Sequence, residues 1–141
     1  MRIKSSAISL TVADVNLSSK FLREQLGFEE KFSADGFAYM AHPSAGMDIV
    51  FLRVGMEVLP KHMHSQKAAG IIVAFVVDDV EAEESRLSRN GVTITLPLQE
   101  DPWGERLFQV EDPNAVTYQI VQWVKPADGQ YADNPGGQHW T

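Results

Sequence analysis

One arrangement, a strand pattern followed by a helix pattern and a glycine stop, occurs twice in this chain, and it constrains the fold more than any other feature. The helical segments run from 14 to 27 and from 79 to 91, so the two copies have nearly the same length. An alternating or continuous apolar run precedes each segment, at 7–12 and at 71–77, as is typical of a strand. The repeat therefore predicts two modules of the same kind.

Both helical segments carry their own start and stop signals. Asp14 or Asn16 can cap the first helix, and Gly27 suits the left-handed conformation that ends it. The second has acids in its first turn and Arg86 and Arg89 in its last, which favours the helix dipole. The apolar residues near helical spacing in the first segment are Leu17, Phe21 and Leu26.

Strand patterns then complete each half. "FAYMA" and "MDIVFLR" follow the first helix, joined by the turn signal "HPSAG", and "VTITL", "ERLFQV" and "VTYQIVQW" follow the second. Each half is therefore predicted to be β-α-β-β-β, which gives an α+β fold class. We expect one domain over 1–124, with modules at about 5–53 and 70–123, a linker at 54–69 and a Gly-, Pro- and Asp-rich tail at 125–141.

Composition excludes several classes of function. The chain has 141 residues, a formal net charge of -7 and no cysteine, so disulfides, thiol catalysis and thiolate metal sites are excluded. The charge argues against nucleic-acid binding and mildly favours a cationic small molecule. No apolar run is long enough to span a bilayer, and no secretory signal is visible, so no membrane partner and a cytoplasmic protein are expected.

One residue does not suit a core strand. Residues 117–123, "TYQIVQW", alternate with the period of a strand, and Gln119 lies at the centre. A buried amide must find partners for both its donor and its acceptor. Gln119 is thus either a satisfied polar residue or a group that faces a ligand.

The two β-α-β-β-β units, with the openings "TVADVNLSSKFLREQLGF" and "VDDVEAEESRLSRNG", resemble the vicinal oxygen chelate superfamily. The ending "DPWGERLFQVEDPNAVTYQIVQ" is similar to its glyoxalase and bleomycin-resistance branch, and the resemblance covers about 5–123. It implies two paired modules that form a cupped mixed sheet, with the helices outside and a site on the concave face. It also implies a homodimer, in which paired modules bury a shared apolar face.

The resemblance implies a set of ligand-facing residues. The inward face of the strands would carry Gln119, and the loop at the rim would present Trp103 as an aromatic wall. Trp103 could instead be a loop anchor. Glu105 forms an acidic cluster with Glu100 and Asp101 that could attract a cation, or it could belong to a plain acidic loop. The expected ligand-binding residues are Trp103, Gln119, Ser9, Thr11, Asp48, Thr117 and Glu105.

Metal-dependent members of this superfamily place a histidine on the first strand and a glutamate or histidine on the last strand of each module. Those places fall here on Ala7, approximately Val50, Ile72 and Gln119. The first three have no donor atom for a metal, and a neutral amide is a poor substitute for a carboxylate. We therefore expect no metal, no cofactor and no catalytic residue at these places.

Two functions remain open. The first is a binding protein, like the bleomycin-resistance proteins, that sequesters a small aromatic or cationic compound in a cup-shaped cavity. The second is a glyoxalase-like lyase, isomerase or dioxygenase with a noncanonical site. It would need a metal on Asp48, His62 and His64, or acid–base work by Glu100 or Glu105. His62 and His64 lie in the linker and are expected to be solvated, so binding without metal is the preferred hypothesis.

Overall fold

The computed structural model describes residues 1–124. The predicted tail at 125–141, including any docking of Tyr131 or Trp140, lies outside the described residues. The chain divides into two compact units. The first comprises Met1–Ile71 with Asp112–Val116, and the second comprises Ile72–Glu111 with residues 117–124.

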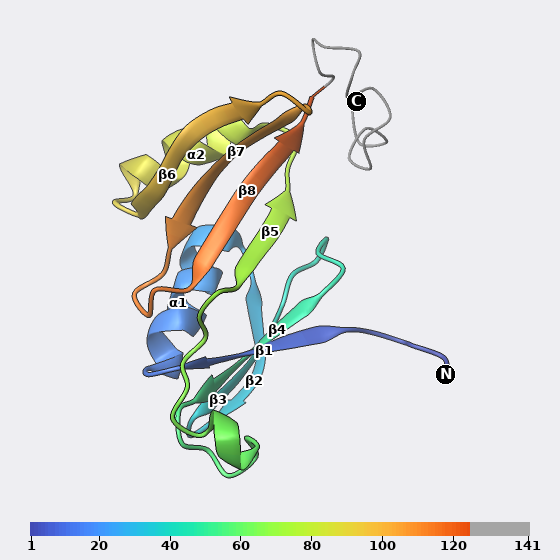
Figure 1. The fold of residues 1–141 in the computed structure, drawn as a ribbon, viewed down its shortest axis with the longest axis vertical. Coiled ribbons are helices and arrows are strands. Elements are labelled where there is room, and N and C mark those ends of the chain that lie inside the picture. Colours follow the sequence, from blue (N-terminus) through green and yellow to red (C-terminus); the bar gives the residue numbers. More distant parts are fainter. Residues whose placement is uncertain (125–141) are drawn as a thin grey trace. The chain divides into compact units, whose positions relative to one another are not determined.

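The first unit is one helix packed on a four-stranded sheet in the order β1-β4-β3-β2 (Figure 1). β1 pairs with β4 in parallel, and the other pairs are antiparallel. Buried apolar side chains on the helix side of the sheet, such as Leu10, Ile49 and Met40, form the core. The elements are β1 (Ala7–Val12), α1 (Val15–Leu26), β2 (Glu29–Ala34), β3 (Phe37–Ala41), β4 (Asp48–Arg53) and the 3-10 turn η1 (Lys61–Met63).

The second unit repeats this topology, with the sheet order β5-β8-β7-β6 and β5 parallel to β8. Helix α2 packs on β6, β7 and β8 through Val80 and Leu87, which are both fully buried. The elements are β5 (Ile72–Val76), α2 (Val80–Arg89), β6 (Thr93–Asp101), β7 (Glu105–Glu111) and β8 (Thr117–Trp123). The α+β class with two β-α-β-β-β modules is confirmed. Each sheet is open and does not close into a barrel.

The helix signals act as the sequence predicts. Asp14 caps α1 by accepting hydrogen bonds from the backbone N–H groups of Asn16 and Leu17, and Gly27 ends the helix at φ 75°. Asp79 caps α2 through the N–H of Ala82. These local hydrogen bonds satisfy backbone donors that a helix start leaves unpaired.

The turns before β4 and β8 are built alike, which supports the duplication. The N–H of Ser44 donates to the ring Nδ1 of His42 (3.0 Å), and the N–H of Asn114 donates to Oδ1 of Asp112 (2.8 Å). In both turns a side chain two residues earlier, followed by proline, takes the backbone hydrogen bond of the turn. The two modules therefore share a turn as well as a topology.

No strand is predicted from the sequence at β2. All six residues of β2, "EEKFSA", are exposed, so no alternation of buried and exposed residues marks the segment. It is a strand because it pairs with β3 at the edge of the sheet. In α1, Leu17 is 42% exposed whereas Ser18 is fully buried.

The predicted linker is packed structure within the first unit. Leu59 is buried against Val50 and Leu52 on the side of the sheet away from α1, and Met56 packs beside them. The N–H of Ala68 donates to the carbonyl of Thr11 (2.7 Å). Part of this open face of the first sheet is therefore covered by residues 54–69.

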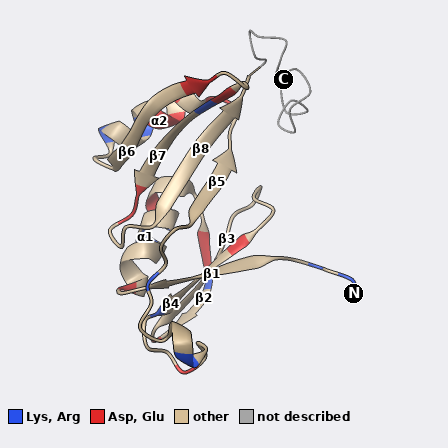
Figure 2. Ribbon diagram, viewed as in Figure 1, with Lys and Arg blue, Asp and Glu red and all other residues tan. Residues whose placement is uncertain are grey.

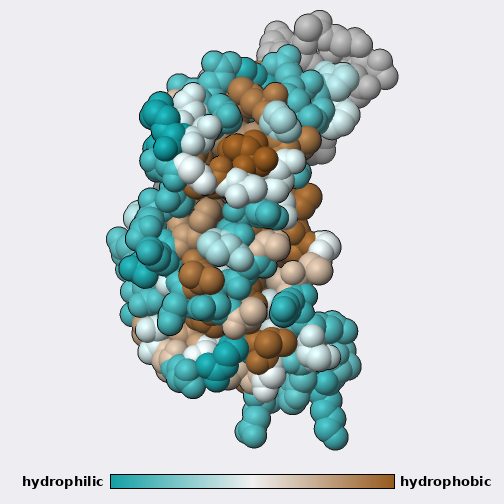
Figure 3. Space-filling model, turned by 90° about the vertical axis from the view of Figure 1, so that its left-hand side faces the viewer, coloured by the Kyte–Doolittle hydropathy of each residue, from teal (hydrophilic) through white to brown (hydrophobic). Residues whose placement is uncertain are grey.

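The surface carries both hydrophilic and hydrophobic residues. On the side drawn in Figure 3, hydrophilic residues predominate and hydrophobic residues come through in separate groups. Within residues 1–124, none of the helices is long and apolar enough to cross a membrane.

Candidate functional site

Gln119 lies on the face of the second sheet that is turned away from α2. Its neighbours in β8, Tyr118 and Ile120, are buried on the helix side. The ladder places Ala74 of β5 and Gln109 of β7 opposite Gln119. Side chains of paired residues share a face, so this open face carries the polar residue that the sequence could not place.

Gln119 belongs to a row of hydrogen-bonded side chains along this face. Its Nε2 donates to Oε1 of Glu105 (3.0 Å), and its Oε1 accepts from Nε2 of Gln109 (2.8 Å). The indole Nε1 of Trp103 donates to the other carboxylate oxygen of Glu105 (2.7 Å). We call Trp103, Glu105, Gln119 and Gln109 the polar row.

The polar row lies over two apolar side chains. In the ladder, the pair Leu107–Val121 lies between the pair of Gln119 and the pair of Glu105. The side chains that form the hydrogen bond from Gln119 to Glu105 must therefore pass over the Leu107–Val121 pair. Leu107 is 4% exposed and Val121 is 2% exposed, although both are on the open face.

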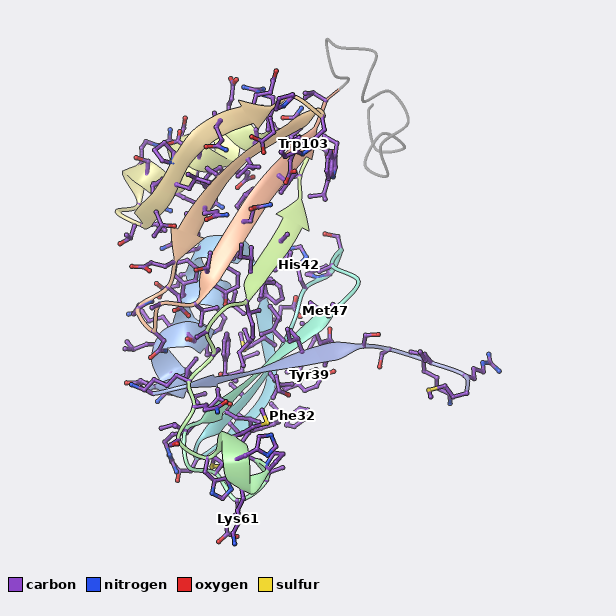
Figure 4. The ribbon with its side chains drawn as sticks, viewed as in Figure 1. Phe32, Tyr39, His42, Met47, Lys61 and Trp103 are labelled. Atoms are coloured by element: carbon purple, nitrogen blue, oxygen red, sulfur yellow. The ribbon has the colours of Figure 1, made fainter. Side chains whose placement is uncertain are left out.

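Trp103 is in the turn between β6 and β7, where the sequence predicts a loop. The side chain is 39% exposed and extends from the end of the second sheet in Figure 4. Its one polar atom is tied to Glu105. The ring thus offers an accessible aromatic surface whose orientation is fixed by a hydrogen bond.

The other two acids of the predicted cluster have separate partners. Glu100 pairs with Nε of Arg106 (3.2 Å), and Asp101 accepts from Gln99 (3.2 Å). Arg106 also pairs with Glu81 of α2, and this contact is the main reason that the pKa of Arg106 is raised above its ordinary value. Acidic and basic residues meet at this end of the β6–β7 hairpin (Figure 2). Glu105 is therefore the acid of this cluster that accepts hydrogen bonds within the polar row.

The remaining predicted residues are distributed along the two sheets. Thr117 is half-buried at the start of β8, on the face of Gln119. In the first unit, Ser9 is exposed on β1, opposite Val50, whereas Thr11 is buried opposite Leu52.

Asp48 is engaged by Tyr39. The Tyr39 hydroxyl donates to Oδ2 of Asp48 (2.5 Å). This hydrogen bond, with desolvation and the carboxylate charge, raises the pKa of Tyr39 above its ordinary value. At neutral pH Tyr39 is therefore a neutral donor that holds the carboxylate in place.

Tyr39 also belongs to an aromatic stack that the sequence does not predict. The rings of Phe32 and Tyr39 are stacked at 5.2 Å and 11°, and Phe37 lies 5.4 Å from Phe32. Phe32 is 59% exposed, and Figure 4 shows it close to Tyr39. Phe32 was overlooked because β2 has no strand signature, and Gln109 because a glutamine in a strand carries no motif.

The four places that would hold a metal do not fit one. Val50 and Gln119 occupy equivalent positions in the two modules. Val50 pairs with Ser9, the third residue of β1, and Gln119 pairs with Ala74, the third residue of β5. Ala7, Val50 and Ile72 carry no donor atom, and both ends of the Gln119 amide are already hydrogen-bonded. Across residues 1–124 the structure gathers no group of three or more His, Cys, Asp or Glu side chains able to hold an ion.

We expect purified protein to contain no stoichiometric divalent metal, and a chelator to leave its melting temperature unchanged, because donor atoms are lacking at these places. Elemental analysis and a thermal melt with and without chelator measure this. One tightly held zinc, nickel, manganese or iron ion per chain would show the expectation to be wrong.

Comparisons with known proteins identify what the chain is similar to. The family described as Glyoxalase/Bleomycin resistance protein/Dioxygenase superfamily matches residues 4–120. A member of that superfamily from Sphaerobacter thermophilus has a similar structure, with a TM-score of 0.71 and 22% identity over 86% of this chain and 98% of the other. Comparison with curated protein sequences gives no significant match.

Two further similar structures have more specific descriptions. TnmS3, described as an antibiotic binding protein from a Streptomyces species, has a TM-score of 0.68 and 22% identity over 87% of this chain and 98% of its own. A lactoylglutathione lyase from Agrobacterium tumefaciens has a TM-score of 0.68 and 14% identity over 86% of this chain and 94% of its own. At these identities the likeness is one of fold.

Proposed function

We propose that this chain, which belongs to the Glyoxalase/Bleomycin resistance protein/Dioxygenase superfamily, binds and sequesters a small planar cationic molecule without using a metal ion. The observation that carries the proposal is the polar row, in which the exposed ring of Trp103 is hydrogen-bonded to Glu105 and Glu105 to Gln119. A flat ring can stack on the indole, and the carboxylate of Glu105 lies next to that surface.

The chemistry of the open faces supports binding more than catalysis. Glu105 accepts from two donors and Glu100 is paired with Arg106, so both acids that could act as a base are held by other groups. A general base must reach the proton that it removes, and an acid engaged in this way is poorly placed to do so. The similarity to an antibiotic binding protein is in line with a binding role.

The alternative is a glyoxalase-like lyase, isomerase or dioxygenase with a noncanonical site. The structural similarity to a lactoylglutathione lyase is in line with this alternative. The metal set considered from the sequence does not assemble in the first unit. Asp48 is bonded to Tyr39, and Nε2 of His64 is 2.7 Å from the carbonyl oxygen of Leu59. The metal-dependent form of this alternative therefore has no assembled set of ligands within residues 1–124.

The proposal is tested by calorimetry with 9-aminoacridine, a planar aromatic cation. We expect a dissociation constant near one micromolar, about 8 kcal/mol, that weakens as salt rises because the attraction to Glu105 is screened. The anionic anthraquinone-2-sulfonate is the matched control for stacking without positive charge. Equal affinity for both compounds, or no binding of either, would contradict the proposal.

A further inference from the structure

The polar row has a direction, and Glu105 sets it. An ionised carboxylate can only accept hydrogen bonds, and both of its oxygens are used here, by the nitrogen atoms of Trp103 and Gln119. The nitrogen of the Gln119 amide must therefore point towards Glu105. With the amide reversed, two oxygens would face one another across about 3 Å, without a proton between them.

The orientation of Gln119 determines that of Gln109. Since the nitrogen of Gln119 is turned to Glu105, its oxygen is turned to Gln109 and requires a donor there. Gln109 supplies its nitrogen, so its own oxygen is left at the far end of the row. No donor to that oxygen occurs within residues 1–124.

We infer that Glu105 is a positioning residue that orients the amides of Gln119 and Gln109 in one direction, so that the row presents the carbonyl oxygen of Gln109 as an acceptor and selects ligands that offer a hydrogen-bond donor. The second half of this inference rests on the proposed binding function. The chemical class that it specifies is a planar cation with an N–H group, such as a ring-bound amine or a protonated ring nitrogen. A planar cation without an N–H group leaves the acceptor unpaired when it displaces water.

The orientation is tested on the protein alone, by nuclear magnetic resonance of the side-chain amides. In the wild-type protein we expect Overhauser contacts between the indole N–H of Trp103 and the amide protons of Gln119, since both donate to the same carboxylate. Glu105→Gln keeps the size of the side chain but can donate as well as accept, so it no longer fixes the direction. The contacts should weaken, and the resonances of the indole N–H and of both glutamine amides should shift.

Glu100→Gln is the matched control. It removes the same charge from the neighbouring strand, but Glu100 pairs with Arg106 and not with the polar row. This variant should leave the amide and indole resonances where they are. If Glu105→Gln moves them no more than Glu100→Gln does, Glu105 does not orient the row and the inference is wrong.

Selectivity is tested with two planar cations, 9-aminoacridine, which has N–H donors, and N-methylacridinium, which has none. We expect the wild-type protein and Glu100→Gln to prefer the N–H compound by about tenfold, as one hydrogen bond of about 1.4 kcal/mol would give. Glu105→Gln should reduce this preference to less than about threefold. A wild-type preference for the methylated compound overturns the selectivity. If neither compound binds, the proposed function fails, whereas the resonance experiment still decides the orientation.

Discussion

We expect Asp112→Ala to lower the free energy of unfolding by about 3–5 kcal/mol, because three donors lose their acceptor and each unsatisfied buried donor costs about 1–3 kcal/mol. Asp112 is 3% exposed, and its carboxylate accepts from the hydroxyl of Ser18 at 2.5 Å and from the N–H groups of Asn114 at 2.8 Å and Val116 at 3.0 Å. Alanine leaves these buried donors without an acceptor. Chemical denaturation followed by circular dichroism measures the loss.

Two variants control this experiment. Ser18→Ala removes one of the three donors to Asp112 and also the acceptor of the Asn114 side-chain amide, so it should cost about 2 kcal/mol for two lost hydrogen bonds. Asp35→Ala removes an aspartate whose side chain is 91% exposed and bonded to Arg53 at the surface, and it should leave stability close to that of the wild-type protein. If Asp112→Ala were as stable as Asp35→Ala, the hydrogen bonds of Asp112 would not be an important source of stability.

Trp103→Ala should lower the affinity for 9-aminoacridine by about 1–3 kcal/mol, the range expected for an aromatic anchor. Fold stability should change little, because the side chain is 39% exposed in a turn. Calorimetry is the better measurement, since Trp123 and Trp140 also contribute to fluorescence. Trp103→Phe keeps a ring but loses the hydrogen bond to Glu105, so it separates stacking from orientation.

Phe32→Ala is the matched control for loss of an exposed ring. Phe32 stacks on Tyr39 in the first unit, where Asp48 also provides a carboxylate. If Phe32→Ala lost the affinity and Trp103→Ala kept it, the aromatic stack would be the binding surface and the polar row would not. A Trp103→Ala protein that unfolds, but binds normally per folded molecule, would mean that Trp103 is a structural anchor.

The parts of the fold that depend on neighbouring residues in the chain could be predicted from the sequence. Asp14 caps α1 and Gly27 ends it because a cap and a left-handed stop need only the next few backbone groups. The alternation around Gln119 likewise put it on the side of the strand opposite to Tyr118 and Ile120, since strand periodicity separates the two sides without knowledge of the partner strand.

The missed parts depend on partners that are distant in the sequence. Ser18 could not be recognised as a core residue because Asp112, which accepts its hydrogen bond, lies 94 positions away. The helical spacing of Leu17, Phe21 and Leu26 gives no sign of this, since the spacing of apolar residues does not reveal where a polar pair is buried. β2 has no periodic signal and exists because β3 offers it a hydrogen-bonding edge.

The sequence by itself determined the two modules, their helix ends and the absence of donor atoms at Ala7, Val50 and Ile72, because each of these follows from residue type and local spacing. Only the tertiary structure decided what Gln119 contacts. Its amide meets Glu105 and Gln109 because the register of β7 against β8 brings these side chains within hydrogen-bond distance. Register is set by pairing along the whole ladder, and a shift of one residue would turn all of these side chains to the other face.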